Sequence, residues 1–410
     1  MLGPRRRVRA YLKGQRAHQQ SFLSALVQQP SDNPPGDCAP HADRAATLLE
    51  GLGLQVERHQ LPEELVKARG MRSCTNLVVR ERFGSGGLTI ALNAHGDVVA
   101  PGEGWTRDPY GAQVRAGTMY GRGVAISKSD FATYAYALLA LKNSGASLTG
   151  SVELHFTHDE EAGGLLGPSW LLEHGLTRPD FVICAGSSYG ITTSHNGCLH
   201  IEVEVHGKSG HAAEPHKGND ALEATNKILS DLYGYRESLS ATRSSVKGIG
   251  CPTLVIGLIS GGTNTNVVPG QVSFRLDRRI VPDESPSDAE RELRSLIADS
   301  VRRMKGIRVN VRRILLAKPL VSRSGQEHIV KAIARNARLV FGLDIPTRGV
   351  PLYTDARHYS EAGIPTVLYG AGPRTLEEAR GHRADERLKL DDLHKATQVV
   401  ALSLLELMVM

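Results

Sequence analysis

The sequence predicts an α/β protein with a second, smaller α+β domain inserted into the first. Short apolar runs of strand type alternate with longer segments of helical spacing. The chain has 410 residues, more than one hydrophobic core usually holds, which favours two domains. The middle of the chain follows the order β-α-β-β-α-β, the ferredoxin-like pattern. We therefore expect one domain from 1–197 and 315–410, and an inserted domain from 198–314.

Apolar spacing predicts the elements of the larger domain in order. Residues at helical spacing predict a helix over about 15–28, which the loop PSDNPPGD ends. The expected strands are 88–94, 152–156, 181–185 and 364–369, and the further expected helices are 127–141 and 391–407. Alternation of strands with helices of this length indicates a largely parallel sheet.

The inserted domain has its own strands and two helices. The expected strands are 200–205, 253–259, 272–276 and 307–311. The first helix carries Ala221, Leu222, Ile228 and Leu232. In the second, Ser285 is suited to cap the helix, Pro286 to its first turn and Asp288 to its dipole. We expect this helix to end at Gly306.

Composition excludes several classes of protein. Apolar residues make up 40% and charged residues 22%, which is typical of a soluble globular chain rather than a disordered one. No apolar run approaches the roughly 18–20 residues of a membrane-spanning helix. The net charge is +6, but basic residues are interleaved with acidic ones, and only Arg5–Arg7 and Arg312–Arg313 cluster. This pattern favours a solvated surface over a nucleic-acid site.

Five scattered cysteines and the absence of a CxxC motif argue against a disulfide framework and for a reducing compartment. The start, MLGPRRRVRAYLKGQ, lacks the apolar stretch of a secretory signal. We expect a cytoplasmic protein whose basic N-terminus is a frayed cationic tail.

Polar residues follow three predicted strands at the point where each strand ends. These residues are His95 and Asp97 after the first strand, Glu160 and Glu161 after the second, and His382 in the loop after the third. In open α/β sheets ligands bind beyond the carboxyl ends of strands. Imidazole and carboxylate groups together suit zinc, manganese or cobalt. Spacing alone leaves open a metal site or three unrelated polar loops.

Eight motifs occur in one order along the chain. They read AHGDVVAPGEGWTRDPY, MYGRGVAISKSD, FTHDEEAGG, GKSGHAAEPHKGNDALE, GGTNTNVVPG, LDRRIVPDE, YTDARHYSEAGIPTVLYGAG and GHRADERLKL. From about residue 20 to its end the chain resembles the cocatalytic zinc amidohydrolases, a family that includes aminoacylase, acetylornithine deacetylase, succinyl-diaminopimelate desuccinylase and the glutamate-releasing carboxypeptidase. The resemblance implies a zinc-exopeptidase-like catalytic domain with an inserted lid and dimerisation domain.

The resemblance also implies a role for each matched residue of the larger domain. His95 would bind one metal ion, and Asp97 would hold its imidazole ring. Glu160 would be the general base, and Glu161 and His382 would be further metal ligands. Taken alone, the adjacent glutamates would be read as a solvated turn, and Asp97 as a cap or turn residue.

Three residues of the inserted domain match the same motifs. The resemblance implies that His211 polarises the substrate carbonyl by reaching across a dimer, and that Asn266 lines the same pocket. It implies that Arg279 binds a substrate carboxylate as a planar fork. Taken alone, His211 would be a surface residue and Arg279 a charge at a strand edge.

Two positions depart from the family pattern. In the family an Asp bridges the two metal ions at the position of Ile126, whose side chain has no donor atom. Asp130 lies one helical turn further on. A second family carboxylate is replaced by Gly186, so three of five expected ligand side chains remain.

These losses leave three interpretations. The first is a mononuclear site on His95, Glu161 and His382. The second is a rebuilt site with substitute ligands, for which the candidates are His158, Cys184, His195 and His358. The third is a metal-free member of the family, either a ligand-binding protein or a non-hydrolytic enzyme that uses the same cleft.

The base and the substrate-binding residues all match the family motifs, which indicates a repurposed pocket rather than a dead one. We expect an altered site with one metal ion rather than two. The expected activity is hydrolysis of an amide bond in a small carboxylate-bearing substrate, such as an N-acyl amino acid, a dipeptide or a carbamoyl-type amide. The expected cofactor is one divalent ion, zinc before manganese or cobalt. The expected assembly is a homodimer through the lid domain, with neither nucleic acid nor membrane as a partner.

Overall fold

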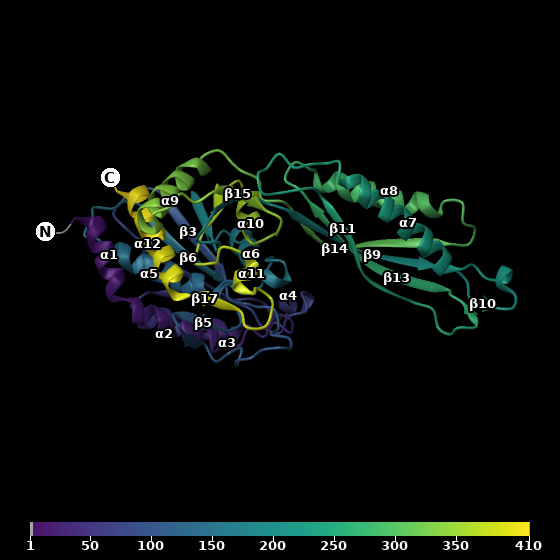
Figure 1. The fold of residues 1–410 in the computed structure, drawn as a ribbon, viewed down its shortest axis with the longest axis horizontal. Coiled ribbons are helices and arrows are strands. Elements are labelled where there is room, and N and C mark those ends of the chain that lie inside the picture. Colours follow the sequence, from purple (N-terminus) through teal and green to yellow (C-terminus); the bar gives the residue numbers. More distant parts are fainter. Residues whose placement is uncertain (1–2, 410) are drawn as a thin grey trace. The chain divides into compact units, whose positions relative to one another are not determined.

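The computed structural model describes residues 3–409 and contains two compact units (Figure 1). Unit 1 comprises Met1–Thr193, Ser322–Arg348 and Thr354–Met410. Unit 2 comprises Ser194–Val321 and Gly349–Tyr353.

Unit 1 is built on an eight-stranded sheet with the order β1-β2-β6-β3-β7-β16-β8-β15. The strands are β1 (Val56–Gln60), β2 (Thr75–Arg82), β3 (Thr89–His95), β6 (Ser151–Thr157), β7 (Phe181–Cys184), β8 (Ile191–His195), β15 (Thr347–Val350) and β16 (Thr366–Leu368). The four strands β6, β3, β7 and β16 are neighbours and run parallel. They are the four strands that the sequence predicts: β3, β7 and β16 are largely apolar, as parallel strands covered on both faces usually are, whereas β6 was predicted from its alternation. Their carboxyl ends therefore meet at one edge of the sheet.

Helices pack around this sheet (Figure 1). Nearly every residue of the long helix α5 and most residues of α12 are buried. The helices are α1 (Pro4–Gly14), α2 (Arg16–Val27), α3 (Ala39–Gly51), α4 (Glu63–Ala68), α5 (Lys128–Lys142), α6 (Pro168–Glu173), α9 (Gln326–Phe341), α10 (Ala356–Glu361), α11 (Leu376–Ala379) and α12 (Leu390–Met408). A small sheet of β4 (Gln113–Arg115), β5 (Thr118–Tyr120) and β17 (Arg387–Lys389) completes the unit. None of the helices within residues 3–409 has the length and apolar character needed to cross a bilayer.

The frayed tail expected at the N-terminus is wrong for the described residues. From Pro4 onward the basic segment forms α1, and its Val8 and Leu12 are buried in the core of unit 1. These two residues lie four positions apart and so share one helix face, while the basic residues occupy the remaining surface.

Unit 2 confirms the predicted ferredoxin-like fold. Its antiparallel sheet has the order β11-β13-β9-β14. The elements are β9 (Gly197–His206), α7 (Ala221–Leu239), β11 (Thr253–Gly261), β13 (Gln271–Ile280), α8 (Pro286–Val301) and β14 (Arg308–Ala317). Alternate residues of β9 and β13 form a core with the two helices, and the other residues of these strands are polar.

The predicted start of α8 is confirmed, whereas its predicted end is wrong. The Ser285 hydroxyl accepts a hydrogen bond from the backbone N–H of Asp288 at 3.4 Å, as expected for the start of α8. The helix ends at Val301, not at Gly306. Gly306 instead has a φ of +75° in the turn before β14, which glycine adopts without steric cost.

Candidate active site

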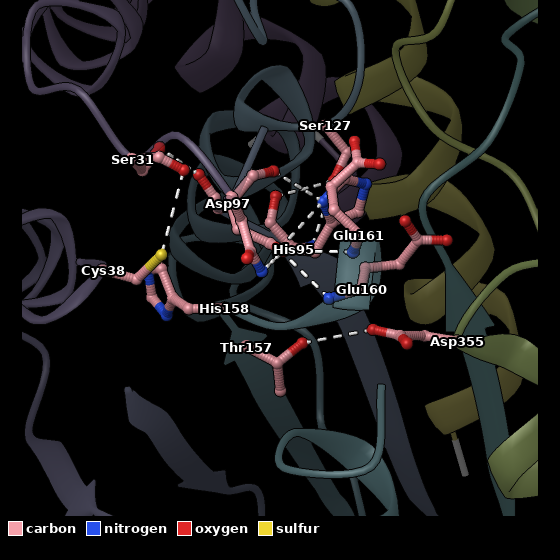
Figure 2. A network of polar contacts seen from close by, with 12 residues as sticks. Ser31, Cys38, His95, Asp97, Ser127, Thr157, His158, Glu160, Glu161 and Asp355 are labelled. Atoms are coloured by element: carbon pink, nitrogen blue, oxygen red, sulfur yellow. Dashed lines mark hydrogen bonds and ion pairs between the residues drawn. The ribbon is translucent and has the colours of Figure 1, made fainter. Parts of the chain in front are cut away.

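The carboxyl ends of β3 and β6 bring the predicted site residues together. His95 is the last residue of β3 and pairs in parallel register with Thr157, the last residue of β6. Three residues beyond Thr157, a short 3₁₀ turn of Glu160–Ala162 returns the chain toward β3. One ligand atom each from His95, Glu160 and Glu161 lies within 4.8 Å of the other two. Figure 2 shows the two glutamates beside the imidazole ring.

Asp97 connects the two strand ends. Its fully buried carboxylate accepts hydrogen bonds from the backbone N–H groups of Glu160 at 3.1 Å and Glu161 at 3.0 Å, and from Asn33 Nδ2 at 3.0 Å. His95 Nδ1 lies 2.9 Å from the backbone oxygen of Asp97 and 3.4 Å from its Oδ1. This contact occupies Nδ1 and leaves Nε2 as the ring nitrogen suited to a metal ion.

Burial and neighbouring charges shift the pKa values of Glu160, His95 and Asp97 in different directions. Burial raises the pKa of Glu160 well above its usual value. The charge of His95 opposes this shift, and the charges of Glu161, Asp355 and Asp97 add to it. Burial alone would lower the pKa of His95, but the hydrogen bond to Asp97 and the surrounding carboxylates raise it. Burial alone would likewise raise the pKa of Asp97, yet its contacts with His95 lower it. The site thus places several carboxyl groups around one imidazole, and their oxygen atoms are ligands that suit a cation.

His382 reaches the same cluster from the loop after α11. Its Nε2 lies 3.5 Å from Glu161 Oε1, and its side chain is about half exposed, at 55%. The hydrogen bond to Glu161 raises the pKa of His382. His382 has a φ of +60°, an uncommon backbone conformation outside glycine that often marks a functional site.

The apolar side chain of Ile126 lies beside the loop that carries His382. A β-carbon placed on Gly381 would lie 3.0 Å from Ile126 Cδ1, so this side chain stands next to the residue that precedes His382. The following residue, Ser127, exchanges hydrogen bonds with the backbone N–H and C=O of His95 at 3.0 and 2.9 Å. Ile126 is therefore held at the site, where it contributes no ligand atom.

Gly186 has no space for a side chain. A β-carbon there would lie 2.8 Å from both the carbonyl carbon of Leu368 and the backbone nitrogen of Tyr369. Asp130, one helical turn after Ile126, does not replace the carboxylate that the family has at the Ile126 position. Its side chain instead accepts backbone hydrogen bonds from Ala371, at 2.6 Å, and from Gly186. Burial raises the pKa of Asp130 to about 7.

The donor set fits a divalent metal ion. Ligand atoms of His95, Glu160 and Glu161 lie within 4.8 Å of one another, and His382 Nε2 lies 3.5 Å from Glu161 Oε1, so two imidazoles and two carboxylates are present at the site. Ligands of this kind suit zinc, manganese and cobalt.

The four candidate substitute ligands lie in different surroundings. His158 is fully buried, its Nδ1 lies 3.0 Å from the Thr75 carbonyl oxygen and its Nε2 lies 3.0 Å from His41 Nδ1, so both ring nitrogens are occupied. Cys184 is buried at the end of β7, and burial raises the pKa of its thiol well above the usual range. His358 Nε2 lies 3.2 Å from the Gly163 carbonyl oxygen. His195 is the last residue of β8, in the segment where the chain passes from unit 1 into unit 2, and its Nδ1 lies 2.9 Å from the Asn196 carbonyl oxygen.

Asp355 is a residue of the cluster that sequence reasoning missed. It is buried just before α10, where Thr157 Oγ1 donates to its Oδ2 at 3.4 Å (Figure 2). Burial raises its pKa to about 7, and its charge also acts on Glu160. Its place within the YTDARHY motif was a signal, but a single Asp before a helix is usually read as a cap.

Unit 2 places its three predicted residues in two locations. His211 on β10 (Gly210–His211) pairs with Val267 on β12 (Val267–Val268), and the N–H of Ala212 donates to the Asn266 carbonyl oxygen at 3.0 Å. His211 and Asn266 are therefore neighbours, and both are exposed. Arg279 lies eight residues along β13 from Gln271, about 26 Å in an extended strand. β10 pairs with β12, which directly precedes the Gln271 end of β13.

Comparisons with known proteins agree on one family. A model of peptidase family M20/M25/M40 matches residues 91–406. Acetylornithine deacetylase from Myxococcus xanthus is 27% identical over 366 residues, which cover 88% of this chain and 90% of that protein. Succinyl-diaminopimelate desuccinylase from Wolinella succinogenes is 28% identical over 391 residues, which cover 92% and 97%.

Solved structures share the fold. The dipeptidase Dug1p from Saccharomyces cerevisiae superposes with a TM-score of 0.77 at 15% identity and covers 98% of each chain. The aminopeptidase PepT from Bacillus cereus superposes with a TM-score of 0.74 at 22% identity and covers 96% of this chain and 98% of its own.

Proposed function

The chain belongs to peptidase family M20/M25/M40, and from this premise we propose that it is a metal-dependent hydrolase of an amide bond in a small carboxylate-bearing substrate. The observation that carries the proposal is the cluster of His95, Asp97, Glu160 and Glu161 at the ends of two parallel strands. It combines metal ligands with the half-buried carboxyl group of Glu160, whose raised pKa suits a general base.

N-acyl amino acids are the proposed substrate class. The two relatives above are named for removal of an acetyl and a succinyl group from amino acids, and they match nearly the full chain. The guanidinium of Arg279 would bind the substrate carboxylate. Dipeptides and carbamoyl-type amides present the same amide and carboxylate groups and belong in the same screen.

We propose that one metal ion, most simply zinc, is held by His95, Glu161 and His382. Two histidines, one glutamate and a water form a known catalytic zinc arrangement. Such an ion polarises a carbonyl group and makes a bound water more acidic. Support for one ion rather than two comes from Ile126, which offers no donor atom, and from Gly186, which has no space for one.

The protein groups around the ion have separate tasks. Glu160 accepts a proton from the attacking water and returns it to the leaving amine. Asp97 fixes the His95 ring and the backbone of both glutamates, so that these groups are in place before substrate arrives. A metal-free binding protein is not favoured, because the ligands and the base are present together.

A homodimer would complete the site. His211 and Arg279 of one chain are too far apart along the sheet of unit 2 to contact the same small substrate. We propose that His211, with Asn266 beside it, acts on the carbonyl group in the partner's site through the inserted domain, where it stabilises the developing oxyanion. The five cysteines are free thiols, which fits the cytoplasm as the compartment.

Hydrolysis by the Glu160→Gln variant tests the proposal. The wild-type protein, loaded with zinc, manganese or cobalt, is assayed on N-acetylornithine, N-succinyl-diaminopimelate and a dipeptide. Glu160→Gln should lower kcat by a factor on the order of 10²–10⁴. It should leave bound metal and substrate affinity unchanged, whereas Glu64→Gln, at an exposed position of α4, should match the wild type. A Glu160→Gln variant with wild-type kcat, or a wild type that cleaves none of these amides, would contradict the proposal.

A further inference from the structure

Arg279 is held on one edge by a carboxylate of its own strand. Its Nε donates to Oδ1 of Asp277 at 3.0 Å and lies 3.2 Å from Oδ2. Asp277 and Arg279 are two positions apart on β13, so both side chains stand on the same face of the sheet. Both are about one-third exposed, which leaves them open to a small molecule.

Asp277 is itself held from the neighbouring strand β9. His200 lies directly opposite it in the ladder, with His200 Nε2 3.1 Å from Asp277 Oδ2. The Cys198 thiol donates to Oδ1 at 3.6 Å. Asp277 therefore has contacts on both oxygens and cannot turn freely about its side-chain bonds.

The other edge of the guanidinium is open. The Tyr353 ring lies 5.6 Å from the Arg279 guanidinium carbon. Within residues 3–409, no group accepts a hydrogen bond from Nη1 or Nη2 of Arg279. The guanidinium is thus oriented by Nε while its Nη edge, the edge that forms two parallel hydrogen bonds with a carboxylate, has no protein partner.

The adjacent Arg278 provides the contrast. It points to the helix side of the sheet, is almost fully buried, and donates to Glu284 Oε1 at 2.6 Å and to the backbone oxygen of Arg279. All of its interactions lie within the protein, so Arg278 is structural. Strand alternation thus assigns opposite roles to two consecutive arginines.

We propose that Asp277 is a positioning residue that presents the Nη edge of Arg279 to the substrate carboxylate, with His200 holding Asp277 in place. This inference rests on the proposed function, because it assumes a substrate with a carboxylate. The Asp277–Arg279 pair is neutral overall, so recognition depends on the orientation of the fork more than on net charge.

A metal ion at the same place is the competing explanation. Ligand atoms of Cys198, His200 and Asp277 lie within 4.8 Å of one another. The Arg279 guanidinium already binds both Asp277 oxygens, and its positive charge opposes a cation on that carboxylate. We therefore assign Asp277 to the arginine, and zinc titration is included as one arm of the test.

The test compares Asp277→Asn with Arg279→Ala and with the double variant. Binding of N-acetylornithine and of its carboxamide is measured by calorimetry in a Glu160→Gln background, and KM and kcat are measured with Glu160 intact. Asp277→Asn should weaken binding of the carboxylate about tenfold, in line with the loss of a hydrogen bond between charged groups. It should leave kcat and carboxamide binding nearly unchanged, and it should add nothing in the Arg279→Ala background. Asp288→Asn, on the exposed first turn of α8, is the matched control.

Three results would overturn the inference. One is an equal effect of Asp277→Asn on carboxylate and carboxamide. Another is the same further loss in the Arg279→Ala background, which would indicate a structural role. The third is zinc binding in a Glu161→Gln background that Asp277→Asn abolishes. In each of these three cases the wild-type protein would still hydrolyse its substrate. If the proposed function were wrong, the wild type would bind N-acetylornithine without cleaving it.

Discussion

Replacement of Asp97 by Asn tests whether the Asp97 carboxylate holds the site residues in place. Asn has almost the same shape as Asp, but it is uncharged and carries an NH₂ group in place of one oxygen. Oδ1 of Asp97 accepts from the N–H of Glu160, and Oδ2 accepts from the N–H of Glu161 and from Asn33. An Asn side chain has one oxygen and one NH₂ group. In either orientation, the NH₂ group faces a backbone N–H, so at least one buried donor loses its acceptor.

The magnitude follows from these contacts. The lost hydrogen bond had a charged acceptor, worth about 1.5–3 kcal/mol, and a buried donor without a partner costs about 1–3 kcal/mol more. We expect Asp97→Asn to lower the free energy of unfolding by about 3–5 kcal/mol. Loss of the group that orients a metal-bound histidine should also weaken metal affinity by about 10–100-fold.

Urea unfolding of the metal-free protein measures the first quantity, and competition with a chelator of known affinity measures the second. Asp43→Asn, at an exposed position of α3, is the control for the change of charge and should behave as the wild type. Stability within 1 kcal/mol of the wild type, together with unchanged metal affinity, would refute the role assigned to Asp97.

Three other predictions concern stability. Gly186→Ala should lower the free energy of unfolding by about 1–3 kcal/mol, because its β-carbon would lie 2.8 Å from the backbone nitrogen of Tyr369; an unchanged urea midpoint would contradict this. Glu386→Gln should cost about 3–5 kcal/mol in thermal unfolding, since it leaves the Arg122 guanidinium buried without its anion, and a wild-type Tm would argue against it. Burial alone would raise the pKa of Glu153, but hydrogen bonds from its neighbours lower it from 4.5 to about 2. The ionised Glu153 therefore stabilises the fold by about 3 kcal/mol above pH 4.5, and this contribution is lost as the pH falls toward 2. The free energy of unfolding, measured with urea, should change less between pH 5 and pH 3 for Glu153→Gln than for the wild type.

The central strands of unit 1 and the topology of unit 2 were predictable because buried positions are apolar and recur with the period of each helix or strand. Strands covered on both faces are largely apolar, as β7 is, and strands covered on one face alternate, as β9 does. The helix at the N-terminus was missed because its basic residues dominate the composition of the segment. Its signal was the spacing of Val8 and Leu12. Their burial, on a helix that contacts α5 and α12, shows that the segment is ordered.

The site was predictable where a motif follows a strand, and not where distant segments meet. His95 and Glu160 are read from strand ends, and the structure brings them together. Asp355 joins them from a segment 195 residues beyond Glu160, and nothing local distinguishes it from a helix cap. His158 lies within a site motif, yet its ring is committed to His41 and Thr75, and such partners are not readable from sequence.

The two consecutive arginines of β13 show what register adds. Their chemistry is identical, so sequence alone distinguishes Arg279 only through the family motif. In the ladder, Arg279 stands opposite Cys198 on the polar face, whereas Arg278 stands opposite Leu199 on the helix face. The strand pairing explains why Arg278 is buried and bound to Glu284, whereas the Nη edge of Arg279 is exposed.

The number of metal ions per chain tests the central claim most directly. Elemental analysis of protein purified without added chelator, and again after incubation with zinc and removal of excess metal, gives this number. We predict one ion per chain, lost when His95 and Glu161 are both replaced by Ala. Two ions per chain would contradict the account, because the chain would then hold a second ion despite Ile126 and Gly186.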